Sequence, residues 1–129
     1  VYSGKGAKGI FTADVISNSQ MNNRDNYRSR ANYEKSKVIW AKAVADGMRD
    51  HMGTTWAIAE SGAAGPTVLR GREEDGMPFT AIAVSGPVSD VVLVKSQHGD
   101  REKNMWQFAE AGMALLQQCI EKAGNKSRL

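Results

Sequence analysis

The sequence predicts an α/β fold, a layered sandwich in which a mixed β-sheet is flanked by helices. Its 129 residues suffice for one hydrophobic core and are too few for two independent domains. Two segments repeat apolar residues every three or four positions, as amphipathic helices do, and four short segments have the composition of strands. Their order is strand, helix, strand, strand, strand, helix. Because only a crossover helix links neighbouring parallel strands, this order predicts a single domain over residues 1–129 with a mixed sheet.

The first half of the chain is predicted to contain one strand and one helix. Residues 9–17, GIFTADVIS, are rich in β-branched and aromatic residues and favour a strand. Residues 18–33 are polar, rich in asparagine and without periodicity, which predicts a long loop of the kind that often carries function. In residues 34–52 apolar side chains recur on one helical face, and Gly53 follows as a helix stop.

Three strands and a long helix are predicted for the second half. Residues 55–60 form a short β-prone run that leads into the small residues SGAAGP. Residues 78–86 and 90–97 favour two further strands, and the glycine, proline and serine between them favour an antiparallel hairpin. The last helix is expected over residues 100–123 and is expected to end at Gly124. The residues expected on its single apolar face are Met105, Phe108, Ala109, Gly112, Leu115, Leu116, Cys119 and Ala123.

Composition favours some classes of protein over others. No apolar run approaches the roughly 20 residues that a membrane-spanning helix needs, so no membrane partner is expected. The single cysteine, Cys119, cannot form an internal disulfide and has no activating base among its neighbours. We therefore expect a buried core cysteine in a cytoplasmic protein.

The charge distribution bears on possible partners. The net charge of +3 is too small to predict a nucleic-acid partner. The N-terminal third is locally basic, which fits either a solvated face or an anion-binding surface. Its basic residues are Lys5, Lys8, Arg24, Arg28, Arg30, Lys35 and Lys37.

Two segments have the composition of a ligand site. In SGAAGP, residues 61–66, small side chains would let backbone N–H groups approach a ligand closely, although a plain structural turn would use the same residues. In HGDR, Asp100 can cap the helix that follows, and Arg101 offers a planar guanidinium suited to phosphate or carboxylate. Capping accounts for Asp100 but not for Arg101, whose charge opposes the helix dipole.

Other patterns do not predict a site. The glycines of GKGAKG, residues 4–9, precede a strand, whereas a dinucleotide-binding loop follows one. His51 and His98 are too few for a metal centre, so neither a metal nor another cofactor is expected.

The second half of the chain resembles the CinA C-terminal domain family. The resemblance rests on WAIAESGAAGPT, FTAIAV, the triplet Gly99-Asp100-Arg101 and the closing MWQFAEAGMALLQQCIEKA, and it is specific over residues 54–123. In that family a strand runs into S/T-G-x-A-G-P, and G-D-R precedes the last helix. The resemblance implies a pocket for a phosphate-bearing nucleotide, since bacterial members deamidate nicotinamide mononucleotide to nicotinic acid mononucleotide and release ammonia. It places in that pocket Ser61, Gly62, Ala63, Ala64, Gly65 and Arg101.

The N-terminal half departs from the family pattern in two places. The family opens with a strand and a helix that carry E-S-C-T-G-G, and we expect this domain to lack them. The family's T-Y-S-N-E-A-K stretch, which contains a catalytic lysine, aligns with residues 15–21 and puts Met21 at the lysine position. Methionine can neither activate a nucleophile nor protonate departing ammonia. The alignment retains Ser17 and Asn18, and these two residues together with Arg101 are the candidate catalytic residues.

Two functions lead at this point, and a third, nucleic-acid binding, rests only on the basic N-terminal third and is placed last. The domain is either an amidohydrolase that acts on a small nucleotide resembling nicotinamide mononucleotide, or a non-catalytic relative that binds nucleotides or anions or serves as an oligomeric interaction domain. A homo-oligomer is expected in either case, because loss of the opening strand and helix would expose a sheet edge or a hydrophobic face.

Overall fold

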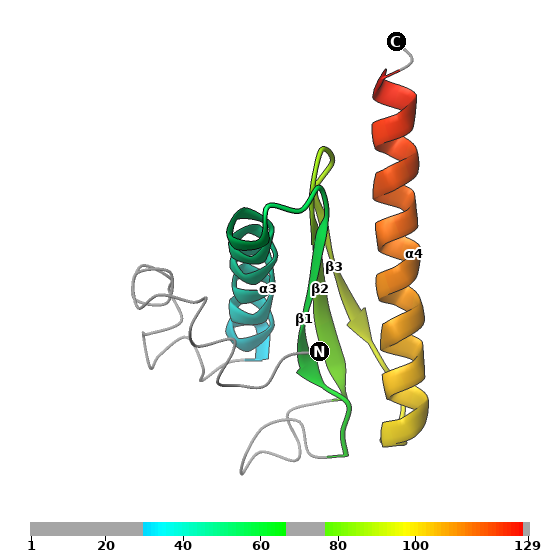
Figure 1. Ribbon diagram of the computed structural model, residues 1–129. Helices are drawn as coiled ribbons and strands as arrows, with labels where there is room; N and C mark the ends of the chain where they lie inside the picture. The colour runs from blue at the N-terminus through cyan, green and yellow to red at the C-terminus, as the bar shows by residue number, and fades with distance from the viewer. Residues whose placement is uncertain (1–29, 67–76, 128–129) are drawn as a thin grey trace.

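Two helices enclose a three-stranded sheet in the computed structural model, which describes residues 30–66 and 77–127. Helix α3 (Arg30–Met52) covers one face of the sheet and helix α4 (Arg101–Ser127) covers the other (Figure 1). This arrangement confirms the predicted α/β sandwich. The strand predicted over residues 9–17, which would supply the parallel pairing of a mixed sheet, lies outside the described residues.

The described sheet has the order β1-β2-β3 with antiparallel neighbours. Strand β1 spans Ala57–Ala63, β2 spans Phe79–Ser85 and β3 spans Asp90–Lys95. The central strand β2 is buried along its whole length, because strands cover both of its edges and helices cover both of its faces. The predicted hairpin of β2 and β3 is confirmed. In its turn the N–H of Gly86 donates to the hydroxyl of Ser89 at 3.3 Å.

Helix α3 begins earlier than predicted and ends where predicted. Its first turn, from Arg30, falls in the segment expected to be a loop, because residues 18–33 are mostly polar and show no helical repeat. At the other end Gly53 has φ +65°, and the N–H of Thr54 donates to the carbonyl of Arg49 at 3.3 Å. This bond and the left-handed glycine form a Schellman cap, so the predicted stop at Gly53 is confirmed.

Each face of the sheet has its own apolar core, because alternate residues of β2 point to opposite sides. Ala81 and Ala83 face α3, and their small side chains allow the helix to pack closely. Ile82 and Val84 face α4. The buried cluster on the α3 side consists of Ala41, Val44, Ala45, Ala59, Ala81 and Ala83. The buried cluster on the α4 side consists of Ile82, Val84, Leu115 and Cys119. The position of Cys119 confirms the expected core cysteine.

Helix α4 is capped as predicted but runs past its predicted end. A carboxylate oxygen of Asp100 accepts the N–H of Lys103 at 3.1 Å, which is the expected N-cap bond. The predicted stop at Gly124 is wrong, because α4 continues to Ser127. Glycine in a helix interior costs only about 1 kcal/mol, so without a following proline or turn signal it does not end a helix.

The apolar residues of α4 form two neighbouring stripes. The predicted apolar face is confirmed at Phe108, Gly112, Leu115, Leu116 and Cys119 and is wrong at Met105 and Ala109, which are exposed. One stripe is buried against the sheet and consists of Phe108, Gly112, Leu115 and Cys119, with the polar Asn104 one turn before Phe108. The other is exposed and includes Met105 (55% exposed), Trp106 (66%), Met113 (62%) and Ile120 (46%). Trp106, Met113 and Ile120 repeat every seven residues, which is about two helical turns, so periodicity alone could not separate this stripe from the buried one. Neither described helix combines the length and hydropathy needed to cross a bilayer.

Candidate functional site

The residues predicted to form a ligand site come together at one end of the sheet. Strands β1 and β3 point in the same direction, because both pair antiparallel with β2. The C-terminal ends of β1 and β3 therefore lie at the same end of the sheet, where α4 also begins (Figure 1). We use the term loop junction for residues 61–66, residues 96–101 and Asn104.

SGAAGP is half strand and half loop. Residues 61–63 extend β1 and pair with β2, so the predicted strand end at residue 60 is too early. A Cβ at Gly62 would lie 2.1 Å from the carbonyl oxygen of Phe79, which is closer than any side chain can approach. Glycine is therefore required here by the close packing of two backbones, whether or not a ligand binds.

The loop half turns at Gly65. Its φ of +84° lies in a region that residues with a Cβ rarely adopt. A Cβ at this position would also lie 2.6 Å from the ring of Pro78. The path of the loop thus depends on glycine at this position. The peptide bond from Gly65 to Pro66 is cis.

Asn104 joins this loop to the start of α4 and to the end of β3. Its side chain is fully buried, and its two amide N–H groups donate to the carbonyls of Ala64 and His98, both at 2.9 Å. Its amide oxygen accepts the hydroxyl of Ser96. Every polar atom of the amide is paired within the protein, so Asn104 connects the SGAAGP loop, which is distant in sequence, to the segment between β3 and α4.

Ser96 completes this buried network. Its hydroxyl oxygen accepts the N–H of His98 at 3.2 Å, and its own N–H donates to the carbonyl of Pro78 at 2.8 Å. The hydroxyl also lies 3.1 Å from the carbonyl of His98, which gives its proton an alternative acceptor to Asn104. The sequence reasoning missed Ser96 and Asn104. One signal was available, because Asn104 lies one helical turn before Phe108 on the buried stripe, and a polar residue at such a position needs partners.

Arg101 lies against the loop half of SGAAGP. Its guanidinium donates to the carbonyl of Gly65 at 3.2 Å, so two elements predicted from the sequence are in direct contact. The residue is otherwise exposed, and a guanidinium has five N–H donors, so Arg101 keeps donors for an anion at the loop junction. The neighbouring Asp100 is occupied by the helix cap and by an ion pair with Lys103 at 3.9 Å.

The two histidines are far apart. His51 lies in the last turn of α3, at the opposite end of the sheet from the loop junction (Figure 1). His98 is exposed, and its Nδ1 accepts the N–H of Asp100 at 3.3 Å. Within residues 30–66 and 77–127 no group of three or more His, Cys, Asp or Glu side chains could hold a metal ion.

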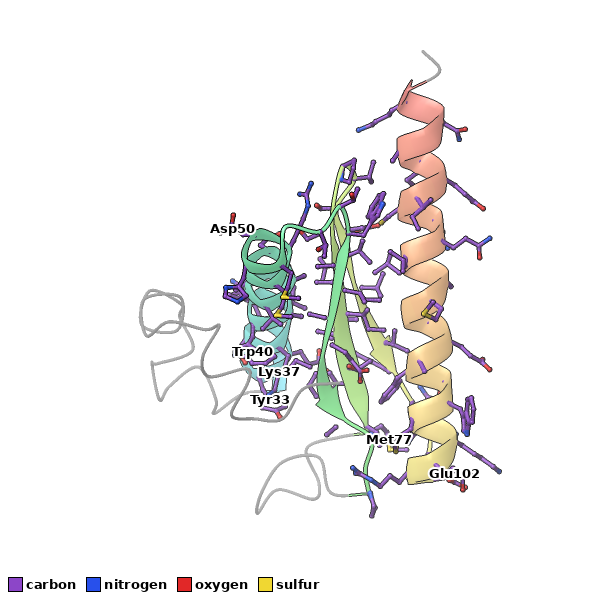
Figure 2. The ribbon with its side chains drawn as sticks, viewed as in Figure 1. Tyr33, Lys37, Trp40, Asp50, Met77 and Glu102 are labelled. Carbon is purple, nitrogen blue, oxygen red and sulfur yellow. The ribbon has the colours of Figure 1, made fainter. Side chains whose placement is uncertain are left out.

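A cluster of aromatic and charged residues lies at the start of α3. Lys37 places its ammonium 5.4 Å from the centroid of the Tyr33 ring, which in turn meets Phe79 edge-on at 5.5 Å. Figure 2 shows Tyr33 and Lys37 together at this end of the helix. Burial lowers the pKa of Lys37 from its usual 10.5. Lys95 pairs with Glu34 at 3.3 Å. Lys37 is therefore half-buried over the Tyr33 ring, and it is Tyr33 that contacts the sheet through Phe79.

Three residues of the predicted catalytic segment lie outside the described residues. They are Ser17, Asn18 and Met21. The described part of the site is therefore the loop junction, with Arg101 as its exposed cation.

These features define the class of protein. It is an α/β sandwich domain in which asparagine and arginine side chains of the last helix hold a loop of small residues. A family model described as the CinA C-terminal domain matches residues 29–120, which contain α3, all three described strands and most of α4. The chain belongs to the CinA C-terminal domain family.

Curated relatives agree with this assignment. A CinA-like protein of Anaeromyxobacter dehalogenans (strain 2CP-C) is 32% identical over 76 residues, which are 59% of this chain and 18% of the relative. A CinA-like protein of Chlorobium phaeovibrioides is 32% identical over 91 residues, which are 67% of this chain and 21% of the relative. The chain thus spans about a fifth of the length of these relatives.

Proposed function

We propose that the domain binds a phosphate-bearing pyridine nucleotide at the loop junction and hydrolyses its amide, as deamidases of nicotinamide mononucleotide do. The observation that carries this proposal is the position of Arg101, held against the loop half of SGAAGP by its bond to Gly65. Membership of the CinA C-terminal domain family supports it.

The electrostatics of the loop junction favour an anion. The planar guanidinium of Arg101 can donate two parallel hydrogen bonds to phosphate oxygens. The positive end of the α4 dipole is already occupied by the carboxylate of Asp100, which accepts the N–H of Lys103, so Arg101 is the group of the loop junction that would bind an anion. In this proposal Arg101 binds the phosphate of the nucleotide or orients its amide end.

The reaction requires more than binding. Water adds to the amide carbonyl, the carbon–nitrogen bond breaks, and the departing nitrogen takes a proton to leave as ammonia. Ser17 and Asn18 are the candidates for these steps, since the alignment retains both of them. We place the reaction in the cytoplasm, because the buried Cys119 is a free thiol.

A second candidate function is a non-catalytic relative that retains nucleotide or anion binding. The observation that favours it is Met21, which stands at the position of the family's catalytic lysine. Loss of one member of a catalytic unit commonly lowers the rate by orders of magnitude.

The experiment that separates these candidates measures binding and turnover together. The purified chain is incubated with nicotinamide mononucleotide, ammonia release is followed, and affinity is measured by calorimetry. If the main proposal holds, ammonia is released and Arg101→Ala weakens binding by at least about tenfold, which corresponds to one charge-assisted contact. Binding without turnover supports the second candidate.

The matched control is Lys103→Ala, which removes a cation from the same helical turn without touching the SGAAGP loop. Lys103 is exposed and pairs with Asp100. Equal losses in Lys103→Ala and Arg101→Ala would contradict a specific role for Arg101 and would indicate a general effect of positive charge. Absence of both binding and turnover would contradict both candidates.

A further inference from the structure

The backbone of His98 is held on both sides by buried side chains. Its N–H donates to the hydroxyl oxygen of Ser96 at 3.2 Å, and its carbonyl accepts an amide N–H of Asn104 at 2.9 Å. Both partners are buried, whereas His98 is exposed. Its imidazole is therefore attached to a fixed backbone in the loop junction, where Arg101 also contacts the SGAAGP loop.

A hydrogen bond to the imidazole determines which nitrogen carries the proton. The backbone N–H of Asp100 donates to Nδ1 of His98 at 3.3 Å, so Nδ1 carries no hydrogen in this arrangement. The imidazole is then neutral, and its hydrogen is on Nε2. A second proton on Nδ1 would meet the N–H of Asp100 and break the bond. His98 thus contributes one neutral N–H donor to the loop junction.

The charges around this imidazole come from two elements, because SGAAGP contains no ionisable side chain. Lys95 at the end of β3 is paired with Glu34 at 3.3 Å. The ionisable side chains that cap and begin α4 are Asp100, Arg101, Glu102 and Lys103. With Arg101 available for the anionic end of a ligand, the neutral donor of His98 suits an uncharged oxygen that gains negative charge during a reaction.

We propose that His98 is the oxyanion donor of the amide hydrolysis, an inference that rests on the function proposed above. As water adds to the amide carbonyl, an electron pair moves onto the carbonyl oxygen. The Nε2–H of His98 donates a hydrogen bond to this oxygen and keeps its proton, because a neutral imidazole polarises a carbonyl without becoming charged. The pair re-forms the carbonyl as the carbon–nitrogen bond breaks. One proton of the water leaves with the nitrogen as ammonia, and its oxygen stays in the new carboxyl group.

Two substitutions test the two nitrogens of the imidazole separately. Asparagine has an acceptor oxygen at the position of Nδ1 and nothing at that of Nε2, so His98→Asn keeps the bond to Asp100 and loses the donor. Glutamine places an N–H group at the position of Nε2, so His98→Gln keeps a donor that does not titrate. With nicotinamide mononucleotide as substrate, kcat for ammonia release should fall at least about 100-fold in His98→Asn at an unchanged KM. His98→Gln should stay within about tenfold of the parent kcat.

The pH dependence is a readout that a purely structural role would not change. The parent kcat should fall between about pH 7.5 and 5, because protonation of Nδ1 breaks the bond to Asp100 and turns the imidazole away. The profile of His98→Gln should lack this fall. Nitrogen NMR of the parent imidazole at about pH 8 should show its hydrogen on Nε2.

The control is His51→Asn, the same change at an exposed histidine in the last turn of α3, which should leave kcat unchanged. Circular dichroism of each variant checks that the fold is retained. Three results would overturn the oxyanion role and leave the proposed function intact: a parent-like kcat in folded His98→Asn, a raised KM alone, as a phosphate contact would give, or a hydrogen on Nδ1. A parent chain that releases no ammonia contradicts the proposed deamidation itself, and the oxyanion role falls with it.

Discussion

Replacement of Asn104 by alanine tests whether the buried amide holds the loop junction together. The substitution removes both donors to the carbonyls of Ala64 and His98 and the acceptor of the Ser96 hydroxyl. Each buried polar group left without a partner costs about 1–3 kcal/mol. The hydroxyl of Ser96 can turn to the carbonyl of His98, 3.1 Å away, which compensates part of the loss. We therefore expect Asn104→Ala to lower the free energy of unfolding by about 2–4 kcal/mol.

The assay is urea unfolding, with thermal unfolding as a second measurement. For a domain of this size the expected fall in melting temperature is about 8–16 °C. Asn125→Ala is the matched control, because Asn125 lies on the same helix and is exposed, and it should change stability by less than about 0.5 kcal/mol. A loss in Asn104→Ala no larger than that of Asn125→Ala would refute the reasoning, because it would mean that water replaces the buried amide without cost.

Three further predictions concern backbone contact, protonation and thiol reactivity. Gly62→Ala should destabilise the domain by about 1–3 kcal/mol, because its Cβ would meet the backbone of Phe79. Gly124→Ala has open space around it and should stabilise α4 by about 0.4–1 kcal/mol. Urea unfolding measures both variants, and a change of stability in the same direction for both would contradict the prediction. Burial lowers the pKa of Lys37, so the unfolded chain holds this proton more strongly and the free energy of unfolding rises with pH between the folded-state pKa and the usual 10.5. Lys37→Met lacks this proton, so its stability relative to the parent should fall between pH 7 and 10. A stability difference that stays constant over this range would contradict the prediction. Burial, together with the charge of Asp90, raises the pKa of the Cys119 thiol. Reaction of this thiol with a thiol-specific reagent at pH 7.5 should therefore be at least about tenfold slower in the native chain than in urea. Equal rates would contradict the prediction.

Strong local patterns allowed the architecture to be predicted from the sequence. The hairpin of β2 and β3 was predictable because β-branched runs flank a glycine–proline turn, and Gly53 was recognisable as a stop because the apolar repeat ends there. The cap by Asp100 follows from its place before an amphipathic segment. In each case the residue acts through neighbours within one or two turns of the chain.

The features that the sequence did not reveal depend on contacts between distant segments. The extension of β1 through residues 61–63 requires the close approach of β2 at Gly62, which a local pattern does not encode. The bond of Asn104 to Ala64 spans 40 residues. In the same way, the division of α4 into a buried and an exposed stripe depends on where the sheet meets the helix.

The connection of Asn104 and Arg101 to the SGAAGP loop also has a consequence for dynamics. The loop's carbonyls at positions 64 and 65 are held by the first turn of α4, so the loop keeps its shape only while that turn is seated on the sheet. Fraying of the turn and release of the loop are therefore one opening event, with one free energy. A molecule that binds the ordered loop must slow amide hydrogen exchange at the start of α4, including at residues that it never touches.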